Sequence, residues 1–373
     1  MGLKYEVAII ARGDGDRKGD CGFAAPSGID AAHRFTRKSE LGGNMTRTRL
    51  CTGVLSLAIF GLITVSTSYA GPAPAKANDC DRACLNGFVD QYMAAVAAHD
   101  PSKLTTAPNV RYTENNVEMK IGEGLWQTSD GWGDYKVYTD DPQTGQVGFL
   151  GVANEDGHLS CFAARLKVVG HKVTEIEVIV ARPAGLGPQS AGPVAGGPTN
   201  LKDKPLFSED EPANERVSRE KLIELADGYF STIQLNTGKI FTTFDPDCQR
   251  MENGSVTANN PNATNPVAKM GCQAQLETGL LKIVTRCRDR RYLVDEQRQM
   301  VFAATFFDHN GTVRQNKLVD GSVRSIGPPF DRPYTFLIFE LFKIKNGKIR
   351  QIEAVLDTVP YYMPSPWVNY AKK

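Results

Sequence analysis

The chain carries the same succession of short segments twice, and this repeat constrains its fold more than any other feature. The recurring segments are Asp90–Tyr92, Tyr112–Asn116 and Ile176–Glu177 in the first copy, and Asp227–Tyr229, Arg250–Gly254 and Ile352–Glu353 in the second. The opening helical segment and the Glu-Asn segment are separated by nearly the same distance in both copies. Because a long-range repeat indicates one fold built twice, the sequence predicts two similar domains.

Each copy is expected to begin with an amphipathic helix and to continue as a run of strands. Apolar residues at helical spacing predict helices over residues 88–96 and 222–233. Strands are expected at residues 110–117, 132–138, 146–154, 159–169 and 172–180, and again at residues 250–257, 280–288, 300–308, 335–344 and 348–356. Asn346-Gly347, between two alternating apolar runs, is typical of a tight hairpin. A helix followed by antiparallel strands, twice, predicts the α+β class.

Composition divides the rest of the chain. Residues 1–44 lack an apolar run and are interpreted as an extension from a misassigned upstream start. Residues 45–70 have the basic beginning, apolar middle and small-residue end of a secretory signal peptide. A membrane anchor is the alternative, but the apolar run is shorter than the roughly 20 residues that a spanning helix needs. We therefore expect a secreted or periplasmic protein that has no membrane segment after cleavage.

The remainder of the chain reads as two domains joined by a linker. Residues 184–214 are rich in Gly and Pro and then in acidic residues, without apolar periodicity, as a linker would be. The first domain is expected at residues 78–183 and the second at residues 215–367. The aromatic residues near the chain end, Tyr361, Tyr362 and Trp367, are expected to be buried between the two copies.

Cysteine use agrees with export. Outside the leader there are three cysteines in each copy, namely Cys80, Cys84, Cys161, Cys248, Cys272 and Cys287. In an oxidising compartment we expect disulfide bonds within each copy, with one or two thiols unpaired. The spacing of Cys80 and Cys84 would also fit a zinc knuckle, but no second pair follows at a matching distance, so no metal site is expected.

The order of these elements resembles the nuclear transport factor 2-like (SnoaL-like) superfamily, in which a curled sheet wraps around a helix and leaves an open pocket. The resemblance covers roughly residues 80–183 and 222–360, and it implies two tandem cone-shaped domains, each with an opening helix and a curled antiparallel sheet. Five segments are also similar to a group of secreted two-repeat proteins of uncharacterised function: Cys80–Leu85, Thr113–Asn115, Gly124–Trp126, Arg290–Glu296 and Phe307–His309. This similarity implies no reaction.

Carboxylates and one histidine are the candidate catalytic groups. Glu252 follows the second opening helix, where a buried carboxylate could act as a general base. Asp308-His309 ends an apolar strand, and because imidazole titrates near neutrality the two could form an acid–base unit. The competing interpretation is structural, since Asn-Gly and Asp-His-Asn-Gly are common turn sequences. The predicted catalytic residues are Glu252, Asp308 and His309.

Seven further residues are predicted to contact a ligand: Glu114, Asn115, Trp126, Arg165, Arg290, Arg291 and Glu353. Glu114 and Asn115 repeat the later Glu-Asn pair, and Trp126 lies in a segment that resembles a pocket rim. For Arg290 and Arg291 the argument is an analogy with other pockets of this fold. Glu353 lies on the apolar face of the final strand, where an acid is either a pocket group or the partner of an arginine such as Arg165. Ion pairing and core packing are the alternatives for all seven.

Charge and motifs exclude several classes of function. Lys and Arg number 43 against 42 acidic residues, so nothing favours a nucleic-acid partner. The sequence has no P-loop, dinucleotide fingerprint or His-x-x-x-His pair, and no cofactor is expected. We expect an exported cofactor-independent lyase, dehydratase or isomerase acting on a small organic substrate.

The alternative is a non-catalytic extracellular protein that binds a small molecule or a partner. The second copy has the longer loops, and loops over a pocket often carry function. We therefore expect the working site there. The oligomeric state stays open.

Overall fold

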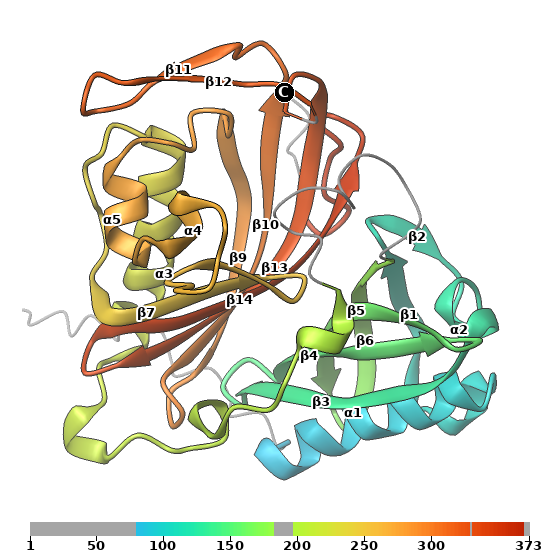
Figure 1. Ribbon diagram of the computed structural model, residues 1–373. Coiled ribbons are helices and arrows are strands. Elements are labelled where there is room, and N and C mark those ends of the chain that lie inside the picture. The colour runs from blue at the N-terminus through green and yellow to red at the C-terminus, as the bar shows by residue number, and fades with distance from the viewer. Residues whose placement is uncertain (1–79, 183–196, 329, 369–373) are drawn as a thin grey trace, which may run out of the picture. The chain divides into compact units, whose positions relative to one another are not determined.

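The computed structural model describes residues 80–182, 197–328 and 330–368 (Figure 1). We call residues 80–182 the first lobe and residues 197–368 the second lobe; both belong to the same compact unit. The expected signal segment, the upstream extension and most of the Gly/Pro-rich linker lie outside the described residues. Within the described ranges, none of the helices combines the length and the apolar character needed to cross a membrane.

The first lobe consists of one long helix against one face of a six-stranded sheet. Helix α1 (Arg82–Ala97) begins at Asp81, whose side chain accepts a hydrogen bond from the backbone N–H of Cys84. The short helices are η1 (Pro101–Lys103) and α2 (Leu125–Thr128). The strands are β1 (Thr106–Glu114), β2 (Val117–Met119), β3 (Ser129–Asp141), β4 (Gln146–Glu155), β5 (His158–Val169) and β6 (Lys172–Ala181). Their order in the sheet is β2-β1-β6-β5-β4-β3.

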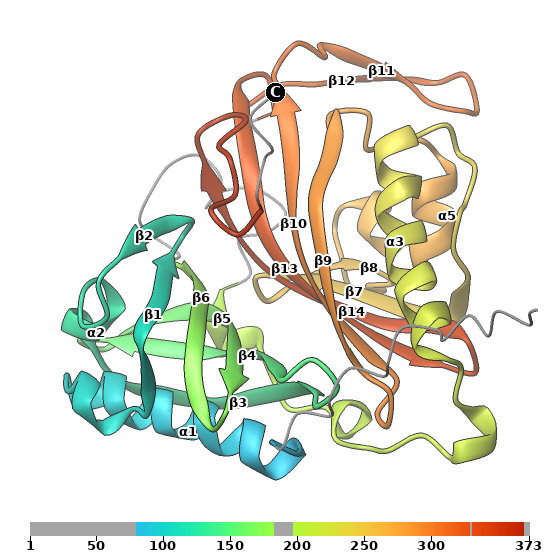
Figure 2. The same cartoon turned by 180° about the vertical axis from the view of Figure 1, so that it is seen from behind.

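The second lobe repeats this order of elements. Helix α3 (Arg219–Leu235) precedes β7 (Phe244–Glu252), β8 (Ser255–Ala258), β9 (Arg286–Asp295), β10 (Met300–Asn310), β13 (Pro333–Lys345) and β14 (Lys348–Val359). The sheet order, β8-β7-β14-β13-β10-β9, matches that of the first lobe strand for strand. Figure 2 shows α3 along one face of this sheet. The predicted α+β class is confirmed. Each sheet is mixed rather than antiparallel as expected, because β1 pairs with β6, and β7 with β14, in parallel.

Shorter elements distinguish the second lobe. Helices η3 (Pro198–Asn200), η4 (Pro205–Phe207) and η5 (Ala213–Glu215) precede α3. Helices α4 (Pro266–Lys269) and α5 (Cys272–Glu277) stand between β8 and β9, and the hairpin of β11 (Gln315–Lys317) and β12 (Val323–Ser325) stands between β10 and β13. These insertions are where the sequence predicted the longer loops.

The turn after the first strand is built in the same way in the two lobes. Asn115 and Asn253 both adopt positive φ, 45° and 44°. The side-chain amide of Asn115 donates to the carbonyl of Val180 at 3.1 Å and accepts from its N–H at 2.8 Å. Asn253 makes the same two bonds with Leu356, at 2.8 and 3.0 Å. The expected single strands at residues 110–117 and 250–257 are therefore each a strand, a tight turn and a second strand.

One expected strand is misplaced. Residues 280–288 were expected to be extended, but residues 278–283 form turns and β9 begins only at Arg286. Leu280 and Val284 are nevertheless buried in the core of the second lobe. A short apolar run shows burial but does not by itself distinguish a strand from other buried conformations.

Apolar packing occurs on both faces of the two sheets. On the helix side, each lobe has its own core, which includes Tyr92 and Phe162 in the first lobe and Phe230 and Phe342 in the second. A third cluster joins the opposite faces of the two sheets, with Tyr135, Leu150 and Ile179 from the first lobe and Phe302, Phe339 and Leu341 from the second. A Cβ atom on Gly148 would lie 2.5 Å from the Phe302 ring, so the contact requires glycine there.

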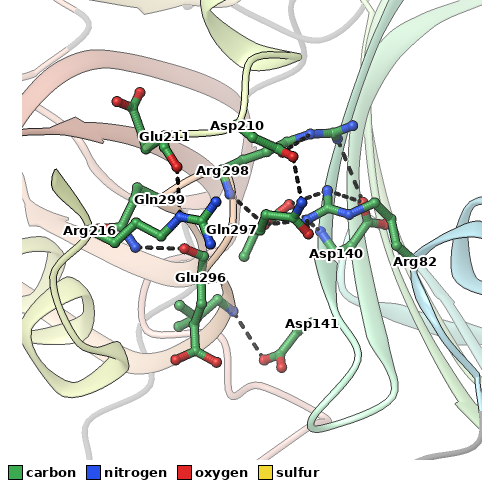
Figure 3. A network of polar contacts seen from close by, with 12 residues as sticks. Arg82, Asp140, Asp141, Asp210, Glu211, Arg216, Glu296, Gln297, Arg298 and Gln299 are labelled. Carbon is green, nitrogen blue, oxygen red and sulfur yellow. Dashed lines mark hydrogen bonds and ion pairs between the residues drawn. The ribbon is translucent and has the colours of Figure 1, made fainter. Parts of the chain in front are cut away.

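A polar network connects the lobes at one end of this contact (Figure 3). Arg82 of α1 donates to both carboxylate oxygens of Asp295 at 2.7 Å and to Asp140 at 3.0 Å. Asp141 accepts from the backbone N–H of Val294 at 3.0 Å. Burial raises the pKa of Asp140 to about 6, although the charge of Arg82 opposes this shift. The start of α1 and the end of β3 are thus joined to β9.

Two disulfides lie within the lobes, as the sequence predicted. Cys80 is bonded to Cys84, and Cys248 to Cys272. Cys161 and Cys287 are buried free thiols. Intramolecular disulfides favour an oxidising environment outside the cytoplasm.

The chain end departs from expectation. Tyr361 and Tyr362 are 43% and 54% exposed rather than buried between the copies. Trp367 is half-buried, with the guanidinium carbons of Arg111 and Arg165 at 4.7 and 4.8 Å from its ring centroid. The prediction of burial is therefore wrong for the two tyrosines, which follow the last strand on an exposed turn.

Candidate functional site

A cavity of about 820 Å³ lies in the second lobe, between the helix-side face of the sheet and the α4–α5 segment. Most of its walls are apolar. The apolar lining includes Ile233, Met251, Val256, Val267, Leu280, Ile283, Val284, Phe307, Phe336, Ile338 and Leu356. The buried polar residues that line it are Tyr229, Arg250, Thr257, Gln275, His309 and Glu340, and Glu252 is partly exposed. A mostly apolar pocket with a few converging polar groups is the usual form of a small-molecule site.

Strand register brings two glutamates to one row of the sheet. Glu252 of β7 is paired with Ala354 of β14, and Ala354 is paired with Glu340 of β13. Arg250 lies two residues before Glu252 and therefore on the same face of β7. At about 4.8 Å between neighbouring strands, the backbones of Glu252 and Glu340 are roughly 10 Å apart. Their side chains therefore approach one another across Ala354.

The guanidinium group of Arg250 has hydrogen-bond partners for some of its nitrogen atoms but not for all of them. Its Nε donates to Thr257 Oγ1 at 3.1 Å and its Nη2 donates to Gln275. Its Nε also lies 3.7 Å from Glu252 Oε1. Nη1 is buried and has no hydrogen-bond partner among the described residues. Buried polar atoms without partners are rare in proteins, and such an atom in a cavity wall is available to a ligand.

Glu340 is the second incompletely bonded group. The residue is 2% exposed, and its Oε2 atom likewise has no hydrogen-bond partner in the part of the chain that is described. Burial, reinforced by the negative charge of Glu252 and opposed by Arg250, raises the pKa of Glu340 to about 8. The carboxyl is thus mostly protonated at neutral pH and can donate a hydrogen bond. The buried hydroxyl of Tyr229 lies next to both Arg250 and Glu340.

His309 lines the same cavity but far from Glu340. In the β10–β13 ladder His309 is paired with Tyr334, whereas Glu340 is paired with Ala303. Six residues along a strand correspond to about 20 Å. His309 Nδ1 donates to the carbonyl of Phe307 at 3.0 Å, and its ring stacks on Tyr334 with centroids 4.4 Å apart. Burial lowers the pKa of His309 to about 4, so the ring is neutral at pH 7.

Asp308 and His309 do not form the expected acid–base pair. Neighbouring residues of a strand point to opposite faces. Asp308 therefore lies away from the cavity, where it accepts from Arg288 at 2.8 Å and from Thr335 at 2.7 Å. Both contacts are buried and structural.

In the first lobe Glu114 and Asn115 are hydrogen-bonded within the protein, whereas Trp126 Nε1 is buried without a hydrogen-bond partner among the described residues. Glu114, at the position equivalent to Glu252, accepts from Tyr112 at 2.9 Å and from the backbone of Leu125 at 2.7 Å. Trp126 is fully buried and meets Tyr92 edge-on, with ring centroids 5.4 Å apart. Asn115 is held by its turn, as described above. These residues act as core and turn residues in the structure.

Arg165 and Arg291 meet at one carboxylate. Arg165 Nε donates to Glu177 at 2.9 Å, and Arg291 donates to both oxygens of Glu177 at 2.9 and 2.6 Å. Both arginines line a second cavity of about 550 Å³, which also includes Trp367. Arg165 forms a further ion pair with Glu175 at 2.7 Å. The two guanidinium groups are therefore largely neutralised by neighbouring acids.

Glu353 and Arg290 are also engaged. Glu353 accepts hydrogen bonds from Tyr135 and Lys204, on the face of the sheet away from the first cavity. Arg290 forms an ion pair with Asp227 of α3 at 2.9 Å. Ion pairing, the alternative interpretation of these residues, accounts for their contacts.

The lobes differ at the positions that form the cavity. By strand register, the residue equivalent to Arg250 is Tyr112 and the residue equivalent to Glu340 is Ala164. The first lobe therefore lacks the guanidinium and the second glutamate. Glu340 was missed in the sequence, although it is a carboxylate within the run Phe336–Phe342, whose other residues are all apolar. A charged residue in such a run is itself a signal of function.

One family model matches part of the chain, in the second lobe. Residues 215–356 match the family model described as "Domain of unknown function (DUF8021)". No curated protein matches the chain.

The similar solved structures include three that each cover less than a third of this chain. A de novo designed protein with a curved β-sheet is 18% identical over 27% of this chain and 87% of its own, with a TM-score of 0.23. A cystatin-like protein of unknown function from Methylobium petroleophilum PM1 is 13% identical over 29% and 82%, with a TM-score of 0.25. A nuclear transport factor 2-like protein of unknown function from Cytophaga hutchinsonii is 10% identical over 26% and 88%, with a TM-score of 0.22.

Proposed function

We propose that the chain is a tandem pair of nuclear transport factor 2-like cone domains, and that the second is a cofactor-independent acid–base enzyme of the lyase, dehydratase or isomerase type. The observation that carries this proposal is the pair of buried, unpartnered atoms, Arg250 Nη1 and Glu340 Oε2, in a cavity that also contains Glu252. Its substrate is a small organic molecule that fits the largely apolar cavity.

The three groups divide an acid–base reaction between them. Glu252 takes a proton from a carbon next to a carbonyl, and the electron pair of the C–H bond moves onto the carbonyl oxygen. Arg250 and the protonated carboxyl of Glu340 donate hydrogen bonds to that oxygen as its negative charge grows. The proton held by Glu252 then returns at another carbon. In the elimination, the carbonyl re-forms, the bond between the β-carbon and the leaving group breaks, and the leaving group departs with that electron pair and the proton from Glu252. Enzymes with two catalytic carboxyls typically keep one protonated and the other ionised by placing them in different surroundings.

His309 and Asp308 have no part in this scheme. His309 is about 20 Å along the sheet from Glu340, and Asp308 lies on the other face. The chemistry consists of proton transfers and, in an elimination, the loss of a leaving group, and the proposal assigns it no cofactor. We therefore replace the predicted pair with Glu252 and Glu340.

The test is turnover by the purified protein, screened against small carbonyl compounds and hydroxy acids. Glu252→Gln and Glu340→Gln should each lower kcat by about a hundredfold to ten-thousandfold. Glu224→Gln, on the exposed surface of α3, is the matched control and should be unchanged. If both cavity variants act at the wild-type rate on every substrate turned over, the assigned roles are wrong.

A second candidate function is binding without turnover, and the apolar walls of the cavity favour it. A carrier would retain its ligand in Glu252→Gln, because the apolar walls dominate affinity, and would give no product under any condition. Ligand depletion and product formation, measured in the same incubation, separate the two functions.

We also propose that the protein is exported. The predicted leader and the two intramolecular disulfides support this. Expression of the full chain in a secreting host should give extracellular or periplasmic protein that begins near residue 71. Retention of the uncleaved chain in the cytoplasm would contradict export.

A further inference from the structure

The polar groups of the cavity wall are confined to one end of its central strands. On β13, Glu340 is followed on the same face by Ile338 and Phe336, towards the start of the strand. Phe307 of β10 is paired with Phe336 and extends this apolar stretch. His309 lies at the far end of the wall, where its ring centroid is 5.0 Å from that of Phe336. The wall thus has a polar end, a long apolar stretch and an aromatic end.

The charges at the polar end are already balanced. The positive charge of Arg250 faces the carboxylate of Glu252 at 3.7 Å. Glu340 is buried in its uncharged form. A ligand carboxylate would add an uncompensated negative charge to this buried site, which is costly. A neutral oxygen would instead accept from Arg250 and exchange a hydrogen bond with Glu340 without adding charge.

The residues of the six-stranded sheet at the opposite end offer no charge to a ligand. His309 is neutral and lies against Tyr334, Phe336 and Phe330. Two exposed polar lining residues lie outside the six-stranded sheet: Asn265 precedes α4, and the charged Arg324 is in β12 of the hairpin. Both the length of the wall and its composition therefore suit an apolar tail.

We infer that the ligand is an elongated, uncharged amphiphile. Its single carbonyl or hydroxyl group is bound by Arg250 and Glu340, and its apolar tail runs along Ile338 and Phe336 towards His309. This inference rests on the proposed use of the same cavity, and it adds the class and the orientation of the molecule bound.

The test compares the binding of matched straight-chain compounds to the purified protein with its disulfides intact. Binding is measured by the displacement of an apolar fluorophore. A long-chain methyl ketone should bind at least tenfold more tightly than the carboxylate of equal length. It should also bind at least tenfold more tightly than a short-chain ketone. Tighter binding of the carboxylate, or equal binding of short and long ketones, would overturn the inference.

Two substitutions locate the ends of the ligand. Glu340→Leu should remove the preference for the ketone over an alkane of equal length. Ile338→Trp, which fills the apolar stretch, should weaken the long ketone at least tenfold and leave the short ketone unchanged. If neither substitution changes binding, the ligand is not placed as inferred. Circular dichroism and melting temperature identify variants that fail to fold, and Ile338→Phe then replaces the larger residue.

The outcomes also separate this inference from the proposed reaction. Long neutral ligands that bind tightly without turnover would support the inference and contradict the enzyme. Turnover of short or anionic substrates would support the enzyme and contradict the inference.

Discussion

Glu340 is the residue with the clearest physical signature in the structure. A carboxyl with a pKa of about 8 differs from its ordinary value of 4.5 because burial disfavours its charged form. At a pH between these two pKa values, Glu340 retains a proton in the folded state that it has lost in the unfolded state. The free energy of unfolding therefore falls as pH rises through this window, by up to about 1.4 kcal/mol per pH unit. Below this pH range Glu340 does not lower the free energy of unfolding. Above the range the loss of stability no longer grows with pH.

Glu340→Gln should remove this slope. The amide cannot ionise, so the variant should gain stability over the wild type progressively from about pH 5 to pH 8. Urea denaturation across this range measures the difference between the two proteins. Parallel stability curves for wild type and variant would show that Glu340 does not titrate as described.

Residue types alone could reveal only part of this site. Glu252 was found because the Glu-Asn segment is repeated. Glu340 has no counterpart in the first lobe, where Ala164 occupies its position, so the repeat gave no sign of it. Asp308-His309 was misleading because adjacency in sequence resembles a catalytic pair, whereas strand alternation separates the two side chains.

At the scale of elements, the conserved geometry of the two turns has a measurable energetic role. Asn253→Asp replaces an amide donor with a carboxylate that faces the carbonyl of Leu356, which Asn253 now contacts at 2.8 Å. The loss should lower the free energy of unfolding by about 1–3 kcal/mol. Asn262→Asp, in an exposed loop, is the matched control and should be nearly neutral. Equal melting temperatures for both variants would contradict this role.

The repeat predicted that the two lobes share one strand order, but periodicity gives strands and not their neighbours, so the order itself was not predicted. Apolar spacing located both helices, although α1 begins at Arg82 rather than at residue 88. Residues 280–284 were misassigned because burial by the inserted α4–α5 segment produces the same apolar pattern as a strand. The longer loops of the second copy were visible in the sequence, but the cavity that they cover was not.

At the scale of the whole molecule, contact between the sheets depends on close approach at Gly148. Gly148→Ala places a methyl group 2.5 Å from the Phe302 ring and should cost about 1–3 kcal/mol. Gly131→Ala, also in a strand of the first lobe, meets no atom within 4 Å and is the matched control. Thermal unfolding of the two variants measures the difference, and similar destabilisation by both would contradict the packing.

The contact between the two sheets is indicated in the sequence by residues Met300–Phe307, which are almost continuously apolar. Strands that are buried on both faces have nearly continuous apolar sequences, whereas strands with one solvated face alternate apolar and polar residues. The contact between the copies was expected instead at the aromatic residues of the chain end. Tyr361 and Tyr362 are exposed, and the sheets themselves form the contact.

The central claim is that Arg250, Glu252 and Glu340 form the working site. Its most direct test is a crystal structure of the protein bound to a long-chain methyl ketone. We expect the ketone oxygen within hydrogen-bond distance of Arg250 Nη1 and Glu340 Oε2, with the alkyl chain directed towards His309. A ligand bound instead in the cavity lined by Arg165 and Trp367, or an empty second-lobe cavity at saturating ketone, would contradict the claim.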